Sequence, residues 1–220
     1  MTVQGAAPVV ERVLPLVVRL ERDAPPQRTA ALEAAARAVL LMVSTGEPAW
    51  RVAVDAWEGA RIRKVVRRAR GAEWRRAAAL EGLTVDHDGA QVRVFPPVPV
   101  DGWPRDLARL QVGGTELDDA TAPPPPPVGA ALVLMSPHVA MSAGKAMAQA
   151  GHAAQLGLRS LPPAAASGWR EAGFPVAVRT ATAARWSAAL AAGAPLVRDA
   201  GFTEVAPGSA TAVFARPATG

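Results

Sequence analysis

The sequence of 220 residues contains no cysteine and only three histidines, His87, His138 and His152. The absence of cysteine excludes disulfide bonds, thiolate metal sites and a cysteine nucleophile. A three-histidine metal centre would need every histidine in the chain, and their spacing is not typical of one, so we expect no metal and no other cofactor. A cytoplasmic protein does not need disulfide bonds, and we expect a cytoplasmic location.

Long apolar runs are also missing, because no stretch of 18 apolar residues occurs and no membrane span is therefore expected. The N-terminal segment from Met1 to Leu14 lacks the basic start and apolar run of a signal peptide. Hydrophobic residues make up 50% of the chain and charged residues 20%. This composition favours a folded protein with a real core over a disordered chain, and the length suits one large domain or two small ones.

Positive charge is concentrated in one segment. The formal net charge is +5, and residues 61–76 hold eight basic residues against one acidic residue. A basic stripe of this kind favours a polyanionic partner such as nucleic acid, through phosphate neutralisation and counterion release. A solvated arginine face is the alternative, since a GC-rich coding background also produces many arginines and few lysines.

Proline marks a boundary near the middle of the chain. Residues 123–127 are five consecutive prolines, which cannot join a helix or a central strand and are typical of a stiff polyproline spacer. The preceding segment is acidic and rich in turn-forming residues. We therefore predict a first domain over residues 1–111, a proline-rich linker over 112–128 and a second domain over 129–220.

In the second half, short apolar runs alternate with helix-prone segments. Thr180 or Thr182 is a candidate N-cap, and Gly193 a candidate helix terminator. Helical crossovers between strands predict an α/β fold, with a mixed, mostly parallel four-stranded sheet flanked by helices. The predicted strands cover residues 130–135, 174–179, 196–198 and 211–216, and the predicted helices cover 142–161 and 182–192.

The first half repeats this order in weaker form. Two tryptophan pairs, Trp57 with Trp74 and Trp169 with Trp186, have the same internal spacing, so one shift in numbering carries the first pair onto the second. We call this shift the tryptophan offset, and we predict a diverged tandem duplication whose two copies pack as an intramolecular pseudo-dimer. The predicted strands of the first copy cover residues 14–20, 62–67 and 92–95, and its predicted helices cover 27–43 and 72–80.

The segment 141–154 carries the first candidate site. On a helix, Lys145, Gln149 and His152 lie at i, i+4 and i+7 and share one face. Ser142 is a candidate N-cap, so Lys145 falls in the first turn, where a lysine opposes the helix dipole. Such a charge suggests phosphate binding together with free backbone N–H groups, and a solvent-facing polar stripe is the alternative. The opposite face, expected to pack on the sheet, consists of Met147, Gly151, Ala154 and Leu158.

The segment 198–214 carries the second candidate site. Asp199 is predicted to lie at the end of a buried strand, where open α/β sheets place their ligand sites. Gly201 permits a sharp turn, and Thr203 offers a hydroxyl four residues after the acid. A carboxylate in this position can act as a general base on water, and an aspartate that only caps the turn is the alternative.

Both segments resemble signatures of the type-2 peptidyl-tRNA hydrolases. The pattern GK-x-x-x-Q-x-x-HA is matched by Gly144, Lys145, Gln149, His152 and Ala153. The pattern DAG-x-T-x-x-x-PGS-x-T is matched by Asp199, Ala200, Gly201, Thr203, Pro207, Gly208, Ser209 and Thr211. The resemblance covers residues 130–217. It implies hydrolysis of the ester that joins a peptide to the terminal ribose of tRNA, with peptidyl-tRNA as the partner.

The resemblance also implies site residues, with Lys145, Asp199 and Thr203 as the catalytic groups. In such a site Asp199 would orient or deprotonate the attacking water, and Lys145 would stabilise the oxyanion or hold the terminal phosphate. Thr203 would position the water or the ribose hydroxyl. A non-catalytic tRNA- or RNA-binding module on the same fold is the alternative function, and a regulatory scaffold without an RNA partner is the third. The expected substrate-binding neighbours are Gln149, His152, Gly201 and Thr211.

The first copy differs from the second at these positions. On the tryptophan offset, Lys145, Gln149 and His152 correspond to Glu33, Arg37 and Leu40, so the first copy cannot be a second active site of the same kind. The family usually works as a homodimer, and we expect the first half to pack on the second half in place of a partner subunit.

Basic residues that the family carries before its GK pattern are missing here. We expect the first copy to compensate by binding the tRNA backbone through its arginines. The residues proposed for this contact are Arg67, Arg68 and Arg70.

Overall fold

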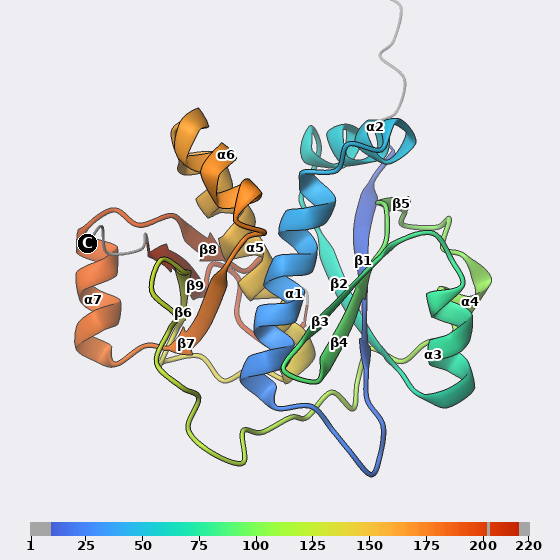
Figure 1. Ribbon diagram of the computed structural model, residues 1–220, viewed down its shortest axis with the longest axis horizontal. Helices are drawn as coiled ribbons and strands as arrows, with labels where there is room; N and C mark the ends of the chain where they lie inside the picture. The colour runs from blue at the N-terminus through green and yellow to red at the C-terminus, as the bar shows by residue number, and fades with distance from the viewer. Residues whose placement is uncertain (1–9, 202, 216–220) are drawn as a thin grey trace, which may run out of the picture.

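The structure is a computed structural model that describes residues 10–201 and 203–215. Residues 1–9, 202 and 216–220, which fall within the two predicted domains, lie outside the described residues. Figure 1 shows two lobes side by side, each built from one sheet and its helices.

The first lobe holds a sheet in the order β2-β1-β4-β3, with β5 paired to the end of β1. The β1–β2 pair is parallel, and the other pairs are antiparallel. Its strands are β1 (Arg12–Arg19), β2 (Lys64–Ala69), β3 (Leu83–His87), β4 (Ala90–Val94) and β5 (Val98–Pro99). Its helices are α1 (Arg28–Val43), α2 (Pro48–Glu58), α3 (Gly71–Ala78) and α4 (Arg105–Ala108).

The second lobe repeats this topology in a sheet of order β7-β6-β9-β8. The β6–β7 pair is parallel, and the β6–β9 and β8–β9 pairs are antiparallel. Its strands are β6 (Ala131–Met135), β7 (Val176–Thr180), β8 (Leu196–Arg198) and β9 (Ala210–Ala215). Its helices are α5 (Ala143–Ser160), α6 (Pro163–Glu171) and α7 (Ala183–Ala191).

These sheets confirm the predicted α/β class, with mixed sheets flanked by helices and a tandem, two-lobed arrangement. The expectation of mostly parallel strands is wrong, because each sheet has a single parallel pair among the described residues. Within the described residues, no helix joins β3 to β4 or β8 to β9, and such connections favour antiparallel pairing. The elements missing from the sequence-based prediction are β3, β5, α2, α4 and α6.

Two tryptophans support the register given by the tryptophan offset. Trp57 Nε1 donates a hydrogen bond to the backbone carbonyl of Arg63, and Trp169 Nε1 donates one to the carbonyl of Pro175, both at 3.0 Å. The two acceptors, like the two donors, are related by the tryptophan offset. Each lobe therefore ties the helix before its second strand to that strand in the same way.

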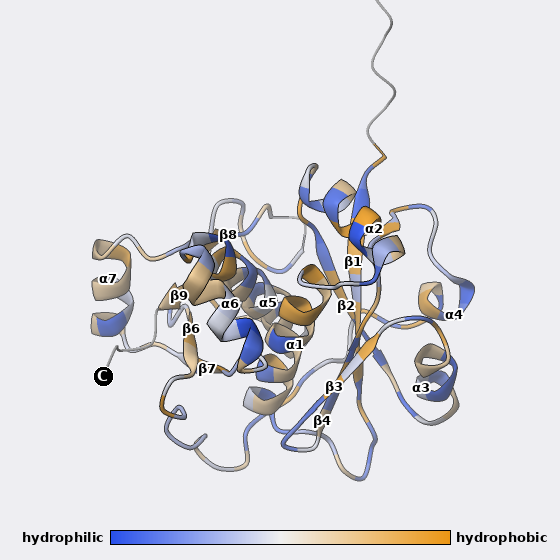
Figure 2. Cartoon of the chain, turned by 45° about the horizontal axis from the view of Figure 1, so that its top comes forward, coloured by the Kyte–Doolittle hydropathy of each residue, from blue (hydrophilic) through white to orange (hydrophobic). Residues whose placement is uncertain are grey.

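The lobes meet through α1 and α5, which lie between the two sheets (Figure 2). Val39 of α1 contacts Gly151 of α5, where a Cβ atom would lie 2.7 Å from Val39 Cγ2. The tryptophan offset relates these two residues, and equivalent positions contact each other at a two-fold axis. The face of α5 that holds Gly151 was expected to pack on the sheet, but at this point it contacts α1. The sheet contact is made instead at Gly157, against Phe214 of β9.

Residues 112–128 hold no helix or strand, in agreement with the predicted linker, but they are not a free spacer. Thr115 is 1% exposed, and its Oγ1 accepts a hydrogen bond from the Gly144 N–H at the start of α5. The carboxylate of Asp119 accepts hydrogen bonds from the N–H and hydroxyl of Thr29 in the first turn of α1. The segment therefore caps both central helices.

Among the described residues, no single helix has both the length and the apolar composition needed to cross a membrane. The helices α1 and α2 meet the two criteria only as a pair bent by 105°. The apolar residues of α1 are buried in the core that the lobes share.

Candidate active site

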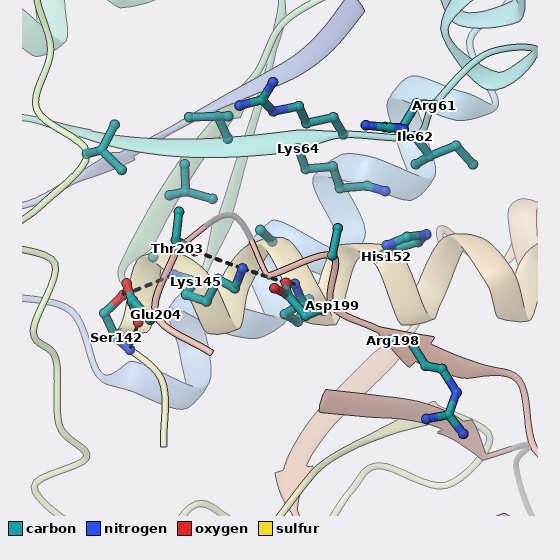
Figure 3. Close-up of a pocket in the computed structure, with 18 residues that line it drawn as sticks. Arg61, Ile62, Lys64, Ser142, Lys145, His152, Arg198, Asp199, Thr203 and Glu204 are labelled. Carbon is teal, nitrogen blue, oxygen red and sulfur yellow. Dashed lines mark hydrogen bonds and ion pairs between the residues drawn. The ribbon is translucent and has the colours of Figure 1, made fainter. Parts of the chain in front are cut away.

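A cleft of about 200 Å³ lies between the lobes, where β2 of the first lobe faces α5 and the loop after β8 of the second (Figure 3). Both lobes contribute polar and charged side chains to its walls. The first lobe contributes Arg61, Ile62 and Lys64 among others. The second lobe contributes Ser142, Lys145, Gln149, His152, Arg198, Asp199, Thr203 and Glu204.

Three predicted catalytic groups meet at one point in this cleft. The Lys145 Nζ atom lies 2.5 Å from Asp199 Oδ2 and donates a hydrogen bond of 2.9 Å to Thr203 Oγ1. The Lys145 and Asp199 side chains are 14% and 6% exposed. Side chains that are distant in the sequence therefore converge on one ion pair, and dashed lines mark these contacts in Figure 3.

The loop after β8 holds Asp199 in place. Its N–H donates to the Ser209 carbonyl at 2.9 Å, and its own carbonyl accepts from the Gly208 N–H at 2.7 Å. Oδ1 of its carboxylate accepts a hydrogen bond of 2.8 Å from the Gly201 N–H. Gly201 has a φ of 78°, and a Cβ atom there would lie 2.4 Å from Pro207 Cγ. The turn therefore requires glycine at this position, which explains the Asp-Ala-Gly and Pro-Gly spacing.

Gln149 and Thr211 support the carboxylate from inside the lobe. The Thr211 hydroxyl donates to Gln149 Oε1 at 2.6 Å, and Gln149 Nε2 donates to Asp199 Oδ2 at 2.8 Å. Thr211 is fully buried, so it fixes which end of the Gln149 amide faces the acid. Both residues were predicted to bind substrate, and in this geometry they position Asp199.

The N-terminal end of α5 is already occupied. Ser142 is its N-cap and accepts a hydrogen bond from the Lys145 N–H, as predicted. The Ser142 N–H and hydroxyl both donate to the carboxylate of Glu204, at 2.8 and 2.6 Å. The Gly144 N–H is bound to Thr115. The N–H groups of Gly144 and Lys145 are therefore not free to hold a phosphate, because internal acceptors already bind them.

Two further titratable groups line the deeper part of the cleft. Burial, and then the positive charge of Lys64, lower the pKa of His152 to about 3, while Asp199 opposes the shift. Burial lowers the pKa of Lys64 to about 7, against the attraction of Glu58. His152 is therefore a neutral imidazole near pH 7, and Lys64 changes charge near that pH.

The predicted arginines do not line this cleft. The Arg67 guanidinium lies 4.4 Å from the centre of the Trp103 ring and donates to the Ala108 carbonyl. Arg67 lies on the opposite face of β2 from Lys64, because side chains alternate along a strand. Arg68 Nε donates to the Gly113 carbonyl, and Arg70 is the N-cap residue of α3. Binding of tRNA by these arginines stays a prediction, but Arg67 and Arg68 hold the segment around α4 and the start of the linker.

Sequence reasoning missed the basic residues that the first lobe contributes to the cleft, above all Lys64. One signal was available, because the whole chain has two lysines, Lys64 and Lys145. Both line the same cleft. Arginine supplies nearly all other positive charge, so the two lysines stand out in the composition. Arg61, Arg198 and Glu204 carried no comparable signal.

The first lobe places a pair at the equivalent position. The tryptophan offset carries Glu33 and His87 onto Lys145 and Asp199, and His87 Nε2 is 2.8 Å from Glu33 Oε2. The other carboxylate oxygen of Glu33 accepts from the Val178 N–H and from Arg179 Nη1, at 3.0 and 2.5 Å. The first copy therefore keeps an acid and a base in contact but exchanges their places.

No family model matches this chain, and no curated protein or solved structure matches it either. Among the residues that the structure describes, no group of three or more metal-ligating side chains could hold a metal ion. The chemistry of the cleft must therefore be argued from its own groups.

Proposed function

We propose that the cleft between the lobes hydrolyses the acyl ester of a peptidyl-tRNA, as the two sequence signatures imply. One observation carries the proposal, namely the meeting of the Lys145, Asp199 and Thr203 side chains in the cleft. Ester hydrolysis by water needs a base for the water and a donor for the oxyanion. An acid, an amine and a hydroxyl in contact supply these functions.

The hydrogen bonds assign a role to the carboxylate. Asp199 Oδ2 is bound by Lys145 and Gln149, whereas Oδ1 accepts from the Gly201 N–H. A carboxylate oxygen accepts two hydrogen bonds, so Oδ1 has capacity for a water molecule. Asp199 takes a proton from this water as its oxygen bonds to the ester carbon.

The amine and the hydroxyl stabilise the charge that develops. Lys145 has three N–H donors, and Asp199 and Thr203 account for two of them. The third is directed to the carbonyl oxygen when it becomes an oxyanion. Thr203 accepts from Lys145, so its own proton remains for the water or the ribose hydroxyl. The ester bond then breaks, leaving a carboxylic acid and the free ribose hydroxyl.

The walls of the cleft suit an RNA end. Arg61 and Lys64 from the first lobe and Arg198 from the second line it, and a positively charged wall attracts phosphate. The RNA would then contact both lobes, which agrees with a pseudo-dimer that takes the place of a homodimer.

The test is release of tRNA from an N-blocked aminoacyl-tRNA. We expect Lys145→Met and Asp199→Asn each to lower the rate by about 10²–10⁴-fold, the range for loss of a base or an oxyanion donor. Arg185→Gln on α7 and Glu171→Gln on α6 are matched controls, because they remove exposed charges outside the cleft and should leave the rate unchanged.

Three outcomes separate the functions. Turnover that both cleft variants lose supports the hydrolase. Binding of tRNA without turnover by the wild-type protein supports the non-catalytic RNA-binding module instead. A protein that neither binds nor hydrolyses the substrate contradicts both functions.

A further inference from the structure

Lys64 is the one lysine that the proposed reaction has not used. It stands at the first residue of β2, in the lobe that lacks the signature residues, and it lines the cleft opposite α5. Figure 3 shows its side chain reaching from β2 toward His152. The lobe without the signatures therefore places an amine in the same cleft as the Lys145–Asp199 pair.

The surrounding contacts hold this amine in a fixed position. Lys64 Nζ donates to Gln155 Oε1 at 2.6 Å and lies 4.9 Å from the centre of the Trp57 ring. Gln155 is 1% exposed, and its Nε2 donates to Glu58 Oε1 at 2.6 Å. The Gln155 oxygen must therefore face Lys64. One N–H of the ammonium is bound to Gln155, and Lys64 itself lines the cleft.

The reaction leaves one proton transfer unassigned. When the ester bond breaks, the ribose oxygen leaves as an alkoxide unless a proton reaches it. The water-activating groups, Asp199 and Thr203, both come from the second lobe. His152 is neutral near pH 7, so it does not act as an acid at that pH. Lys64 lies on the opposite wall of the same cleft.

We propose that Lys64 is the general acid that protonates the leaving ribose oxygen, an inference that rests on the proposed function. The step balances. Water gives one proton to Asp199 and bonds to the carbonyl carbon, the carbon–oxygen bond to ribose breaks, and its electron pair takes a proton from the Lys64 ammonium. The neutral amine then regains a proton as Asp199 loses one, and the sum is ester plus water to acid plus alcohol.

The charged surroundings of Lys64 suit this role. Burial lowers the pKa of Lys64 to about 7, so the amine gives up and regains a proton near neutrality. The titratable or charged groups around it are Glu58 from α2, His152 and Arg159 from α5, Asp199 after β8, and Arg61 and Arg63 beside it in the chain. The acid form is needed, so kcat for the ribose ester should fall as the pH rises above about 7.

The test compares two esters of one N-acetyl amino acid in wild type and Lys64→Met, which keeps the apolar stem. The tRNA ester has a poor leaving group, whereas p-nitrophenolate leaves without a proton. We expect Lys64→Met to lower kcat about 10²-fold on the tRNA ester and less than about threefold on the p-nitrophenyl ester. Lys145→Met, which removes the oxyanion donor, should lose both activities.

Two control variants distinguish proton donation by Lys64 from a purely electrostatic effect of its positive charge. Lys64→Arg keeps the positive charge but cannot release a proton near neutral pH, so it should lose kcat on the tRNA ester as Lys64→Met does. Arg61→Gln removes a charge from the same wall, and its main effect should be a higher KM for the tRNA ester.

Failure of the proposed role of Lys64 and failure of the proposed function give different experimental results. Equal losses of Lys64→Met on both esters, or full kcat in Lys64→Arg, would overturn the role of Lys64. A wild-type protein that hydrolyses neither ester would instead contradict the proposed function. Retained p-nitrophenyl esterase activity in Lys64→Met shows that the variant is folded.

Discussion

The two lobes place an acid and a base at the same position of the fold, but in exchanged order. In the second lobe the base, Lys145, is on the central helix and the acid, Asp199, follows the strand. In the first lobe the acid, Glu33, is on the helix and the base, His87, ends the strand. A contact between these two positions is therefore a property of the fold. The Glu33–His87 and Lys145–Asp199 pairs differ in the groups that surround them.

Both carboxylate oxygens of Glu33 are bound by protein groups. Oε1 accepts from Arg179 and from the Val178 N–H of the other lobe, and Oε2 lies 2.8 Å from His87 Nε2. The strand that carries His87 turns at once through Asp88 and Gly89, which both have positive φ, as tight hairpin turns require. In the second lobe the connection between β8 and β9 is longer, and its described residues 199–201 and 203–209 include Thr203 and Glu204, which line the cleft.

The largest expected effect comes from giving the second lobe the pair of the first. We expect Lys145→Glu combined with Asp199→His to lower tRNA release by at least about 10³-fold, because the oxyanion donor Lys145 and the water-activating carboxylate of Asp199 are both lost. The single Lys145→Glu variant places two carboxylates together, so adding Asp199→His should restore stability without restoring hydrolysis. Urea unfolding and the release assay on the same preparations measure both quantities.

Two results would contradict this comparison of the lobes. A double variant that still hydrolyses the ester would show that the order of acid and base does not matter. A double variant less stable than the single Lys145→Glu variant would show that the position does not favour an acid–base contact in either order.

The next effect is on stability and concerns Glu33. We expect Glu33→Ala to lower the free energy of unfolding by about 3 kcal/mol, because the largely buried Arg179 loses its carboxylate partner and keeps only carbonyl acceptors, and the Val178 N–H loses its acceptor. Urea unfolding followed by tryptophan fluorescence measures the loss. Glu33→Gln is the conservative control, since it keeps one acceptor for the Val178 N–H and should cost less.

A double variant tests whether the lost free energy of unfolding comes from the Glu33–Arg179 contact. Replacing Arg179 by Met in the Glu33→Ala background removes the positive charge that has lost its carboxylate partner. This change should recover part of the lost free energy of unfolding. If the two losses simply add, the Glu33–Arg179 contact is not the cause.

The sequence carried enough information for the fold class and for the central site. The tryptophan spacing set the register between the copies, and local patterns placed both motifs at the ends of regular elements. Helices and strands with weak local sequence patterns were not predicted. α6, for example, begins at Pro163 directly after α5, so the two prolines indicate the end of one helix without revealing that another follows.

The residues that line the cleft were harder to predict from the sequence. Which side of β2 faces the other lobe depends on packing between lobes, and the segment 61–76 does not reveal it. Arg67 and Lys64 therefore looked alike as parts of one basic stripe, although they point to opposite faces of the strand. The same limit applies to Glu204, which meets Ser142 only because a loop folds back over α5.

The smallest effect concerns the axis that relates the lobes, where Val39 meets Gly151. We expect Gly151→Ala to lower the free energy of unfolding by about 1 kcal/mol, because the new methyl group would lie 2.7 Å from a stiff β-branched side chain and this outweighs the better helix propensity of alanine. Gly168→Ala in α6 is the matched control, with no atom within 4 Å, and should stabilise the protein by up to about 1 kcal/mol. Val39→Ala added to Gly151→Ala should cost less than the two single changes together, since it makes room for the methyl group. Additive losses would mean that the two positions do not meet and that the axis lies elsewhere.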